Sequence, residues 1–266
     1  MNIGASSSCF YPLETEKALE LVGKVGIKIT EVFFNSPSEL EAPFIRQLEK
    51  IKSEYSMDIT AVHPFMSFSE GYSIFSSYRR RYTDSLEFFK KYFEAAAALG
   101  ASFLNLHGSN GGKTIPDSEY AERLGALIEE GKTFGVRVSH ENVVHYSGET
   151  PQFMEYLRSQ LGENFKMTLD LKQARRAGID PFDFVERLGS SICHIHVSDC
   201  SKTEDCLTPQ RDGLFDFPRL FKKMGSLGYG GSYIVELYRH NFADENELKR
   251  GVDYLNALAS AVWPDR

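Results

Sequence analysis

One pattern repeats along the whole chain, and it constrains the fold more than any other feature. A short apolar run ends in small or polar residues, and a longer amphipathic stretch follows it. Short runs of this kind, several of them rich in Val, Ile, Phe or Tyr, are typical of buried parallel strands. We expect eight strands, at Ile3–Ser7, Ile27–Phe34, Ile59–His63, Phe103–His107, Val136–Glu141, Met167–Asp170, Ile192–Val197 and Tyr233–Leu237.

The amphipathic stretches between these runs predict helices. Pro43 and Pro151 stand at early positions, where a helix tolerates proline, and Gly100 and Gly135 follow two of the stretches as expected C-caps. The predicted helices are Glu14–Val25, Pro43–Tyr55, Arg79–Leu99, Asp117–Phe134, Thr150–Leu161, Pro181–Leu188, Phe217–Leu227 and Glu245–Val262. Strand–helix pairs that recur about every thirty residues predict an α/β fold, a (β/α)8 TIM barrel, as a single domain over residues 1–266.

A doubly wound open sheet is the alternative fold. It would need a glycine-rich phosphate turn after the first strand, and Gly4-Ala5-Ser6-Ser7 does not supply one. The length of 266 residues is ordinary for one barrel, and a hydrophobic content of 42% is enough for a sizeable core. These observations favour the barrel.

The charge of the chain argues against several kinds of partner. The formal net charge is -7, so we expect neither nucleic acid nor an anionic membrane surface to bind.

Four cysteines lack the close pairing of a structural zinc site, and we interpret them as reduced thiols of a cytoplasmic protein. We see neither a signal peptide nor an apolar stretch as long as a membrane span.

Polar side chains interrupt the apolar runs near the ends of the predicted strands. In a barrel the carboxyl ends of the strands converge on one mouth, where active sites lie, so residues far apart in sequence meet there. The side chains concerned are His63, His107, Glu141, Asp170, His194, His196 and Glu236.

Four of these side chains, on the fifth to eighth strands, predict a metal site: Glu141, Asp170, His196 and Glu236. Three carboxylates at short range repel one another, and a divalent cation removes that repulsion. Carboxylate oxygens with one imidazole suit Mn, Mg, Co or Zn, and we favour a single Mn ion. Alternatives remain, since Asp170 could be a helix N-cap and His196 a core histidine, whereas a buried unpaired Glu236 would be costly.

Several short motifs make the chain resemble the xylose-isomerase-like TIM barrel superfamily, the sugar phosphate isomerase/epimerase family, along nearly its whole length. The motifs are His140-Glu141-Asn142, Leu169-Asp170, His194-Ile195-His196-Val197-Ser198-Asp199 and Val235-Glu236. The resemblance to ketose 3-epimerases and hydroxypyruvate-isomerase-like members implies that Glu141, Asp170, His196 and Glu236 bind one metal. It also implies that Glu141 and Glu236 are catalytic, moving a proton through a metal-stabilised enediolate of a sugar or sugar phosphate.

The chain departs from the family pattern at positions that bear on the substrate. Gln173 stands where the sixth-strand motif usually has His, and Lys202 where the epimerases often have Arg. We expect substrate contacts from Gln173, Lys202 and Arg211, with solvated surface charge as the alternative for the two basic residues. His63, His107 and His194 are further substrate-binding candidates. For His63 and His107 the alternative is a hydrogen bond within the barrel, and either His194 or His196 could orient the other.

Other functions stay open. An inosose-dehydratase-like lyase could use the same metal site, and Gln173 keeps open a barrel that binds sugar without catalysis. An endonuclease IV-type nuclease is disfavoured, because Gln173 replaces one of its ligands and the chain is acidic. Barrels of this type often associate with copies of themselves, so we expect a homodimer or a homotetramer. The resemblance also implies a role in carbohydrate metabolism. An aromatic loop (Phe65, Phe68, Tyr72 and Phe75) could form a lid, or simply pack beneath the loop.

Overall fold

The strands form a closed parallel barrel. The computed structural model describes residues 1–64, 69–110, 114–210 and 212–263. Within these ranges each strand pairs with the next along the chain, and the last pairs with the first. This confirms the predicted (β/α)8 barrel. The strands are β1 (Asn2–Ser6), β2 (Ile29–Phe34), β3 (Asp58–Pro64), β4 (Phe103–Leu106), β5 (Arg137–Glu141), β6 (Met167–Asp170), β7 (Ile192–Val197) and β8 (Ser232–Val235).

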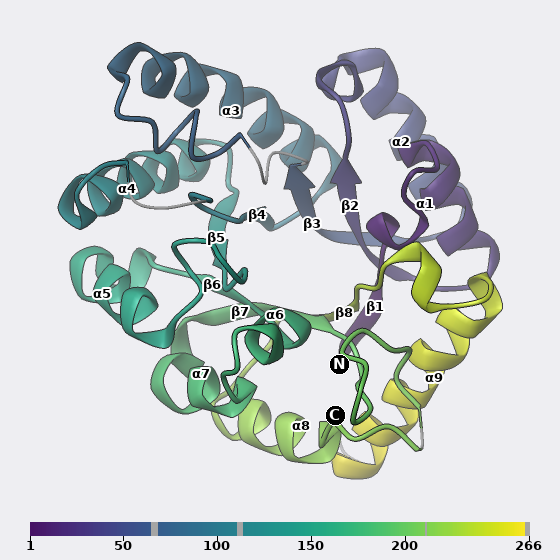
Figure 1. Ribbon diagram of the computed structural model, residues 1–266. Coiled ribbons are helices and arrows are strands. Elements are labelled where there is room, and N and C mark those ends of the chain that lie inside the picture. The colour runs from purple at the N-terminus through teal and green to yellow at the C-terminus, as the bar shows by residue number, and fades with distance from the viewer. Residues whose placement is uncertain (65–68, 111–113, 211, 264–266) are drawn as a thin grey trace.

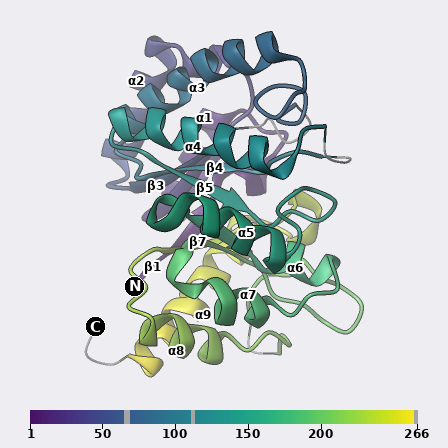
Figure 2. The same ribbon diagram turned by 90° about the vertical axis from the view of Figure 1, so that its left-hand side faces the viewer.

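Helices surround the barrel, as Figure 1 shows along its axis. Two views at right angles place α2 and α3 on one side of the barrel and α8 and α9 on the other (Figures 1 and 2). The helices are α1 (Thr15–Lys24), α2 (Ala42–Glu54), α3 (Arg79–Leu99), α4 (Asp117–Thr133), α5 (Pro151–Leu161), α6 (Leu171–Arg176), α7 (Pro181–Leu188), α8 (Phe217–Ser226) and α9 (Glu245–Val262). The short helix α6 was not predicted, because six residues are too few to show helical periodicity.

The helix ends follow from local chemistry. Gly100 ends α3 in the left-handed conformation at φ 76°, as the sequence predicted. At the start of α5, the side chain of Thr150 accepts a hydrogen bond from the amide of Phe153, and Pro151 takes the first helical position. Such caps fix where each helix stops and the next strand begins.

The core lies between the helices and the outer face of the barrel, where large side chains such as Phe34, Phe93 and Leu220 are fully buried. Gly4 allows β1 to approach β2 closely, because a Cβ atom there would lie 1.8 Å from the carbonyl oxygen of Ile29. A tightly closed barrel of this kind holds its strand ends in fixed positions.

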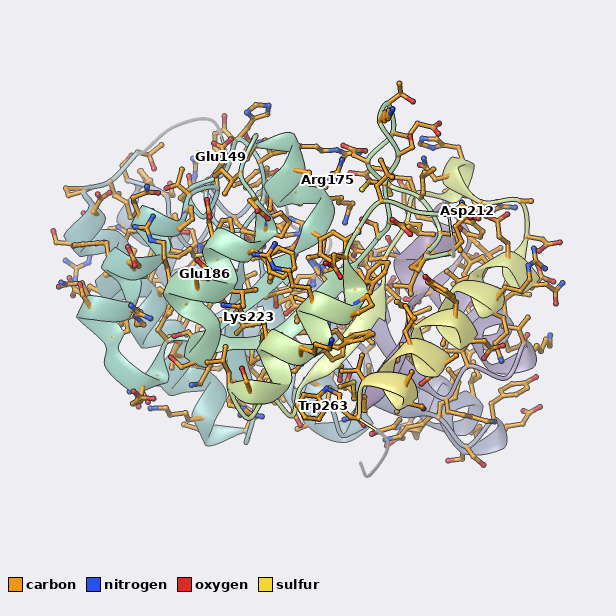
Figure 3. The ribbon with its side chains drawn as sticks, turned by 90° about the horizontal axis from the view of Figure 1, so that it is seen from below. Glu149, Arg175, Glu186, Asp212, Lys223 and Trp263 are labelled. Atoms are coloured by element: carbon orange, nitrogen blue, oxygen red, sulfur yellow. The ribbon has the colours of Figure 1, made fainter. Side chains whose placement is uncertain are left out.

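Loops and helix starts that follow the strands form one face of the molecule. Figure 3 places Glu149, Arg175 and Asp212, which follow β5, β6 and β7, towards that face, and Trp263 towards the opposite face. Within the described ranges, we find no helix that is long and apolar enough to cross a membrane.

The aromatic loop gives a mixed outcome for the predicted lid. Phe65 and Phe68 lie outside the described residues. The side chain of Tyr72 is 68% exposed, whereas Phe75 is buried and stacks on Tyr120 with ring centroids 3.7 Å apart. Phe75 therefore packs beneath the loop, as the alternative interpretation expected.

Candidate metal centre

The ends of β5 to β8 bring together the four side chains of the predicted metal site. Glu141, Asp170, His196 and Glu236 each offer one ligand atom, and these atoms lie within 4.8 Å of one another. Nδ1 of His196 is 3.4 Å from Oε2 of Glu236, 3.5 Å from Oε1 of Glu141 and 3.7 Å from Oδ2 of Asp170. Three carboxylate oxygens thus surround one imidazole nitrogen.

This donor set fits a divalent cation. Among the described residues, the buried Nδ1 atom of His196 makes no hydrogen bond, although the three carboxylates surround it. A buried polar atom without a partner is unusual, and a lone pair directed at a cation would explain it. Oxygen-rich coordination with one imidazole suits ions such as Mn²⁺ or Mg²⁺.

The two carboxylate oxygens of Asp170 face different partners. Oδ1 accepts a hydrogen bond of 3.0 Å from the amide of Gln173 and so caps the start of α6, while Oδ2 faces His196. The N-cap and the metal-ligand interpretations of Asp170 are therefore compatible. Asn142 supports this position, because its side chain accepts from the Asp170 amide at 2.6 Å and donates to the Asp170 carbonyl at 3.0 Å.

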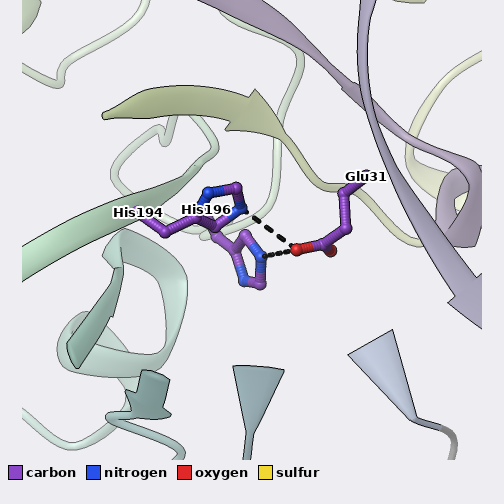
Figure 4. Close-up of side chains that lie close together, drawn as sticks. All are labelled: Glu31, His194 and His196. Atoms are coloured by element: carbon purple, nitrogen blue, oxygen red, sulfur yellow. Dashed lines mark hydrogen bonds and ion pairs between the residues drawn. The ribbon is translucent and has the colours of Figure 1, made fainter. Parts of the chain in front are cut away.

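Glu31 on β2 is a member of the site that the sequence interpretation missed. Its carboxylate is fully buried, and Oε2 lies 3.2 Å from Nε2 of His196 and 3.0 Å from Nε2 of His194 (Figure 4). A carboxylate behind an imidazole fixes the ring and its tautomer. A proton on Nε2 would leave the lone pair of Nδ1 in His196 available to a cation between the other carboxylates. The signal was a single acid inside the predicted apolar run Ile27–Phe34.

The electrostatics of the site are set by burial and by paired charges. Burial opposes ionisation of Glu31, but the imidazoles of His196 and His194 outweigh it and hold the pKa of Glu31 well below its usual range. The pKa of Glu141 is likewise held well below its usual range, since His196 and His107 outweigh burial. Both groups are therefore carboxylates at neutral pH.

Lys172, on the first turn of α6, is the second residue that the sequence interpretation missed. Its side chain is only 3% exposed, and Nζ donates to Oε2 of Glu236 at 2.6 Å and to Oδ2 of Asp170. Burial disfavours the ammonium form, but Asp170 and Glu236 outweigh it, and the pKa of Lys172 is raised well above its ordinary value. A Lys near a strand end is usually solvated, so its sequence position carried no signal.

Comparison with known proteins establishes the family. Residues 19–258 match the family model described as "Xylose isomerase-like TIM barrel". The chain belongs to this family. The suspected resemblance is thus confirmed over most of its length.

Three known proteins are similar to this chain over nearly its whole length. An uncharacterized protein of Methanocaldococcus jannaschii is 24% identical, over 98% of this chain and 92% of its own length. The crystal structure of a D-tagatose 3-epimerase-like protein has a TM-score of 0.80 and 20% identity, covering 98% of both chains. D-Psicose 3-epimerase from Clostridium cellulolyticum, solved with D-tagatose, has a TM-score of 0.78 and 18% identity, covering 98% of this chain and 99% of its own.

A pocket of about 270 Å³ in this xylose isomerase-like barrel adjoins the candidate metal ligands. Its lining includes the two candidate catalytic residues, Glu141 and Glu236, and also Lys172. The other described residues of its lining are Ser8, Tyr11, Phe33, His107, Val143, Tyr146, Gln173, Leu237 and Tyr238. A cavity at or just below the usual lower limit of roughly 300 Å³ fits one small polar molecule.

Two of the histidines proposed as substrate contacts do not line this pocket. His63 is fully buried, and its ring contacts the carbonyl of Pro64 at 3.0 Å and Oε2 of Glu141 at 3.3 Å, as the alternative of hydrogen bonds within the barrel expected. His194 lies one layer deeper in β7 than His196, because two residues along a strand return to the same face. It therefore contacts Glu31 and not the pocket.

The other proposed substrate contacts have different outcomes. His107 and Gln173 line the pocket, and Oε1 of Gln173 also accepts from the amide of Val144 at 3.3 Å. Lys202 is exposed and is absent from the described lining, which agrees with its surface-charge alternative. Arg211 lies outside the described residues.

A second cluster shares Glu141 with the metal centre. His63, His107 and Glu141 also offer ligand atoms within 4.8 Å of one another. Nε2 of His107 lies 3.5 Å from Oε2 of Glu141, whereas Oε1 faces His196. The two oxygens of Glu141 therefore have separate partners, which fixes the plane of its carboxylate.

Asp199, the last residue of the seventh-strand motif, shapes the loop after β7. Its carboxylate accepts from the amides of Cys200 at 2.8 Å, Phe215 at 3.1 Å and Gln210 at 3.3 Å. Its role in the described structure is to hold this loop against the barrel mouth.

Proposed function

We propose that this protein is a divalent-metal-dependent sugar isomerase or epimerase that moves a proton at the carbon next to the carbonyl of a ketose. The observation that carries the proposal is the convergence of Glu141, Asp170, His196 and Glu236 beneath a small pocket. The similarity to a D-tagatose 3-epimerase-like protein and to D-psicose 3-epimerase supports it.

Glu141 and Glu236 are the proposed proton-transfer residues, because both line the pocket where the substrate carbon would lie. Burial opposes ionisation of Glu236, but His196 and Lys172 outweigh it, so its pKa is lowered, as is that of Glu141. Each carboxylate can therefore act as a base at neutral pH. Epimerisation then requires one glutamate in its ionised form, which accepts a proton from one face of the carbon, and the other in its protonated form, which donates a proton to the opposite face.

Asp170 and His196 would hold the ion together with the two glutamates, without moving protons. When bound, the ion supplies positive charge that stabilises negative charge developing on the substrate oxygens. We favour Mn²⁺ as the ion, on the basis of the oxygen-rich donor set.

The size and the lining of the pocket favour a single sugar unit as the substrate. Tyr11, Phe33, Tyr146 and Tyr238 offer apolar surface, while His107 and Gln173 offer hydrogen-bonding groups. Few polar groups placed on a mostly apolar lining are typical of small-molecule sites.

The test is an assay of the purified protein with Mn²⁺ and a panel of ketoses and ketose phosphates in deuterated water. We expect one substrate to gain deuterium at the isomerised or epimerised carbon. Glu141→Gln and Glu236→Gln should each reduce the rate by about 10²–10⁴-fold, since each removes a positioned acid–base group. The matched control is Glu186→Gln, on the surface of α7, where Glu186 pairs with Lys223 at 3.3 Å (Figure 3).

The same assay separates the proposal from its alternatives. Loss of a hydroxyl group from the substrate would indicate a lyase, and tight sugar binding without turnover would indicate a binding protein. Full activity of Glu236→Gln would contradict its assignment as a proton-transfer residue.

A further inference from the structure

The ammonium group of Lys172 contacts two oxygens that the metal centre needs. Nζ lies 2.6 Å from Oε2 of Glu236 and contacts Oδ2 of Asp170. These same two oxygens face Nδ1 of His196, at 3.4 Å and 3.7 Å. Lys172 therefore binds the same two carboxylate oxygens that a cation held by these ligands would use.

A divalent ion and this ammonium group would compete for the same two carboxylate oxygens. An ion bonded to Oε2 of Glu236 would lie roughly 2.1 Å from that oxygen. Because Nζ of Lys172 is 2.6 Å from it, the two cations would lie within about 5 Å of each other in a buried site, where like charges repel strongly.

Buried carboxylates also require a counter-charge when no ion is bound. Asp170 is fully buried and Glu236 nearly so, and a buried charge without a partner is strongly destabilising. The side chain of Lys172, itself 3% exposed, supplies that charge from the same short helix that Asp170 caps.

We propose that Lys172 is the built-in counter-ion of the metal-free centre, and that a divalent ion binds by displacing its ammonium group into the pocket above. The inference rests on the metal centre of the proposed function, and it adds a residue for which the family resemblance gave no role.

The pocket offers the displaced group a place. Lys172 already lines it, and Nζ lies 6.0 Å from the ring centroid of Tyr238, within range of a cation–π contact. Lys172 is also the one Lys or Arg among the described residues of the lining. Once displaced, its ammonium group can donate to a substrate oxygen.

Calorimetric titration of Mn²⁺ into chelator-treated protein tests the proposal. Lys172→Met keeps an unbranched side chain, one atom shorter than that of lysine, and removes the competing charge, so it should bind Mn²⁺ about tenfold more tightly than the wild type, or more. Its metal-free form should unfold at a lower temperature, because Asp170 and Glu236 lose their counter-charge. Lys202→Met removes the same charge from an exposed position and should change neither value. Equal or weaker Mn²⁺ affinity of Lys172→Met would overturn the proposal.

A measurement on the wild type does not depend on the folding of a variant. Reductive methylation followed by peptide mass spectrometry should modify Lys172 slowly in chelator and several-fold faster with Mn²⁺, while Lys202 reacts alike in both. Equal or slower reaction of Lys172 with Mn²⁺ overturns the displacement.

The outcomes also separate this inference from the proposed function. Tighter Mn²⁺ binding by Lys172→Met, together with no turnover of any sugar by the wild type, would support the displacement and contradict the isomerase. Failure of both proteins to bind Mn²⁺ would overturn both. Turnover with unchanged affinity would overturn the displacement alone.

Discussion

At the scale of single residues, Glu31 determines how His196 can serve the site. Its carboxylate lies 3.2 Å from Nε2 of His196, on the opposite side of the ring from the three carboxylates. The ring is thus held between two sets of acids. Through the orientation of His196, Glu31 therefore affects metal binding, although Glu31 is not one of the four proposed metal ligands.

Glu31→Gln should weaken Mn²⁺ binding by about 10–100-fold, because the ring of His196 loses the carboxylate that fixes its tautomer. Calorimetric titration measures this. Glu39→Gln is the matched control, because Glu39 follows the same strand but bonds to Thr15 and the amide of Asn35. An affinity of Glu31→Gln equal to that of the wild type would show that Glu31 only fills space.

At the scale of elements, the junction of β6 and α6 links folding to the site. Asp170 ends the strand, caps the helix through Oδ1 and faces His196 through Oδ2, and the same helix carries Lys172. A change at this one position should therefore affect both helix stability and metal binding, and two substitutions can separate the effects.

Asp170→Asn keeps an oxygen that can cap α6, whereas Asp170→Ala removes it. Both variants should lose Mn²⁺ affinity, but Asp170→Ala should be less stable than Asp170→Asn by about 1 kcal/mol, the usual contribution of an N-cap. Urea unfolding of the chelated proteins measures the difference. Equal stabilities would mean that the cap contributes nothing here.

The sequence predicted the elements better than the neighbourhood of each side chain. The short apolar runs located the eight strands, and the strand ends bring Glu141, Asp170, His196 and Glu236 together. The positions of His194 and Lys172 could not be read in the same way. His194 lies below the pocket because it comes two residues before His196 along β7. Lys172 is buried because it belongs to the six-residue helix α6, which has no recognisable sequence pattern.

At the scale of the whole molecule, the barrel buries titratable groups that link stability to pH. His140 is fully buried beside Tyr120, with Nε2 2.7 Å from the phenol oxygen. Burial, as the largest cause, lowers the pKa of His140 from 6.5 to about 4. Between these values the unfolded chain binds a proton that the folded protein does not, so stability falls as the pH decreases through this window.

The free energy of unfolding should therefore contain a contribution from His140 of roughly 3 kcal/mol that is present above pH 6.5 and lost by about pH 4. Urea unfolding of chelated protein across this range should show a shallower pH dependence for His140→Gln than for the wild type. His145→Gln, at an exposed position, should keep the wild-type dependence. Parallel curves for His140→Gln and the wild type would contradict the assignment.

The proposed isomerase requires a cation held by four side chains at the ends of four strands. Anomalous diffraction from crystals grown with Mn²⁺ tests this directly. We predict one peak within bonding distance of Glu141, Asp170, Glu236 and Nδ1 of His196, with Nζ of Lys172 moved away from Glu236. A peak elsewhere, or no peak with Lys172 still bound to both carboxylates, would contradict the proposed metal centre.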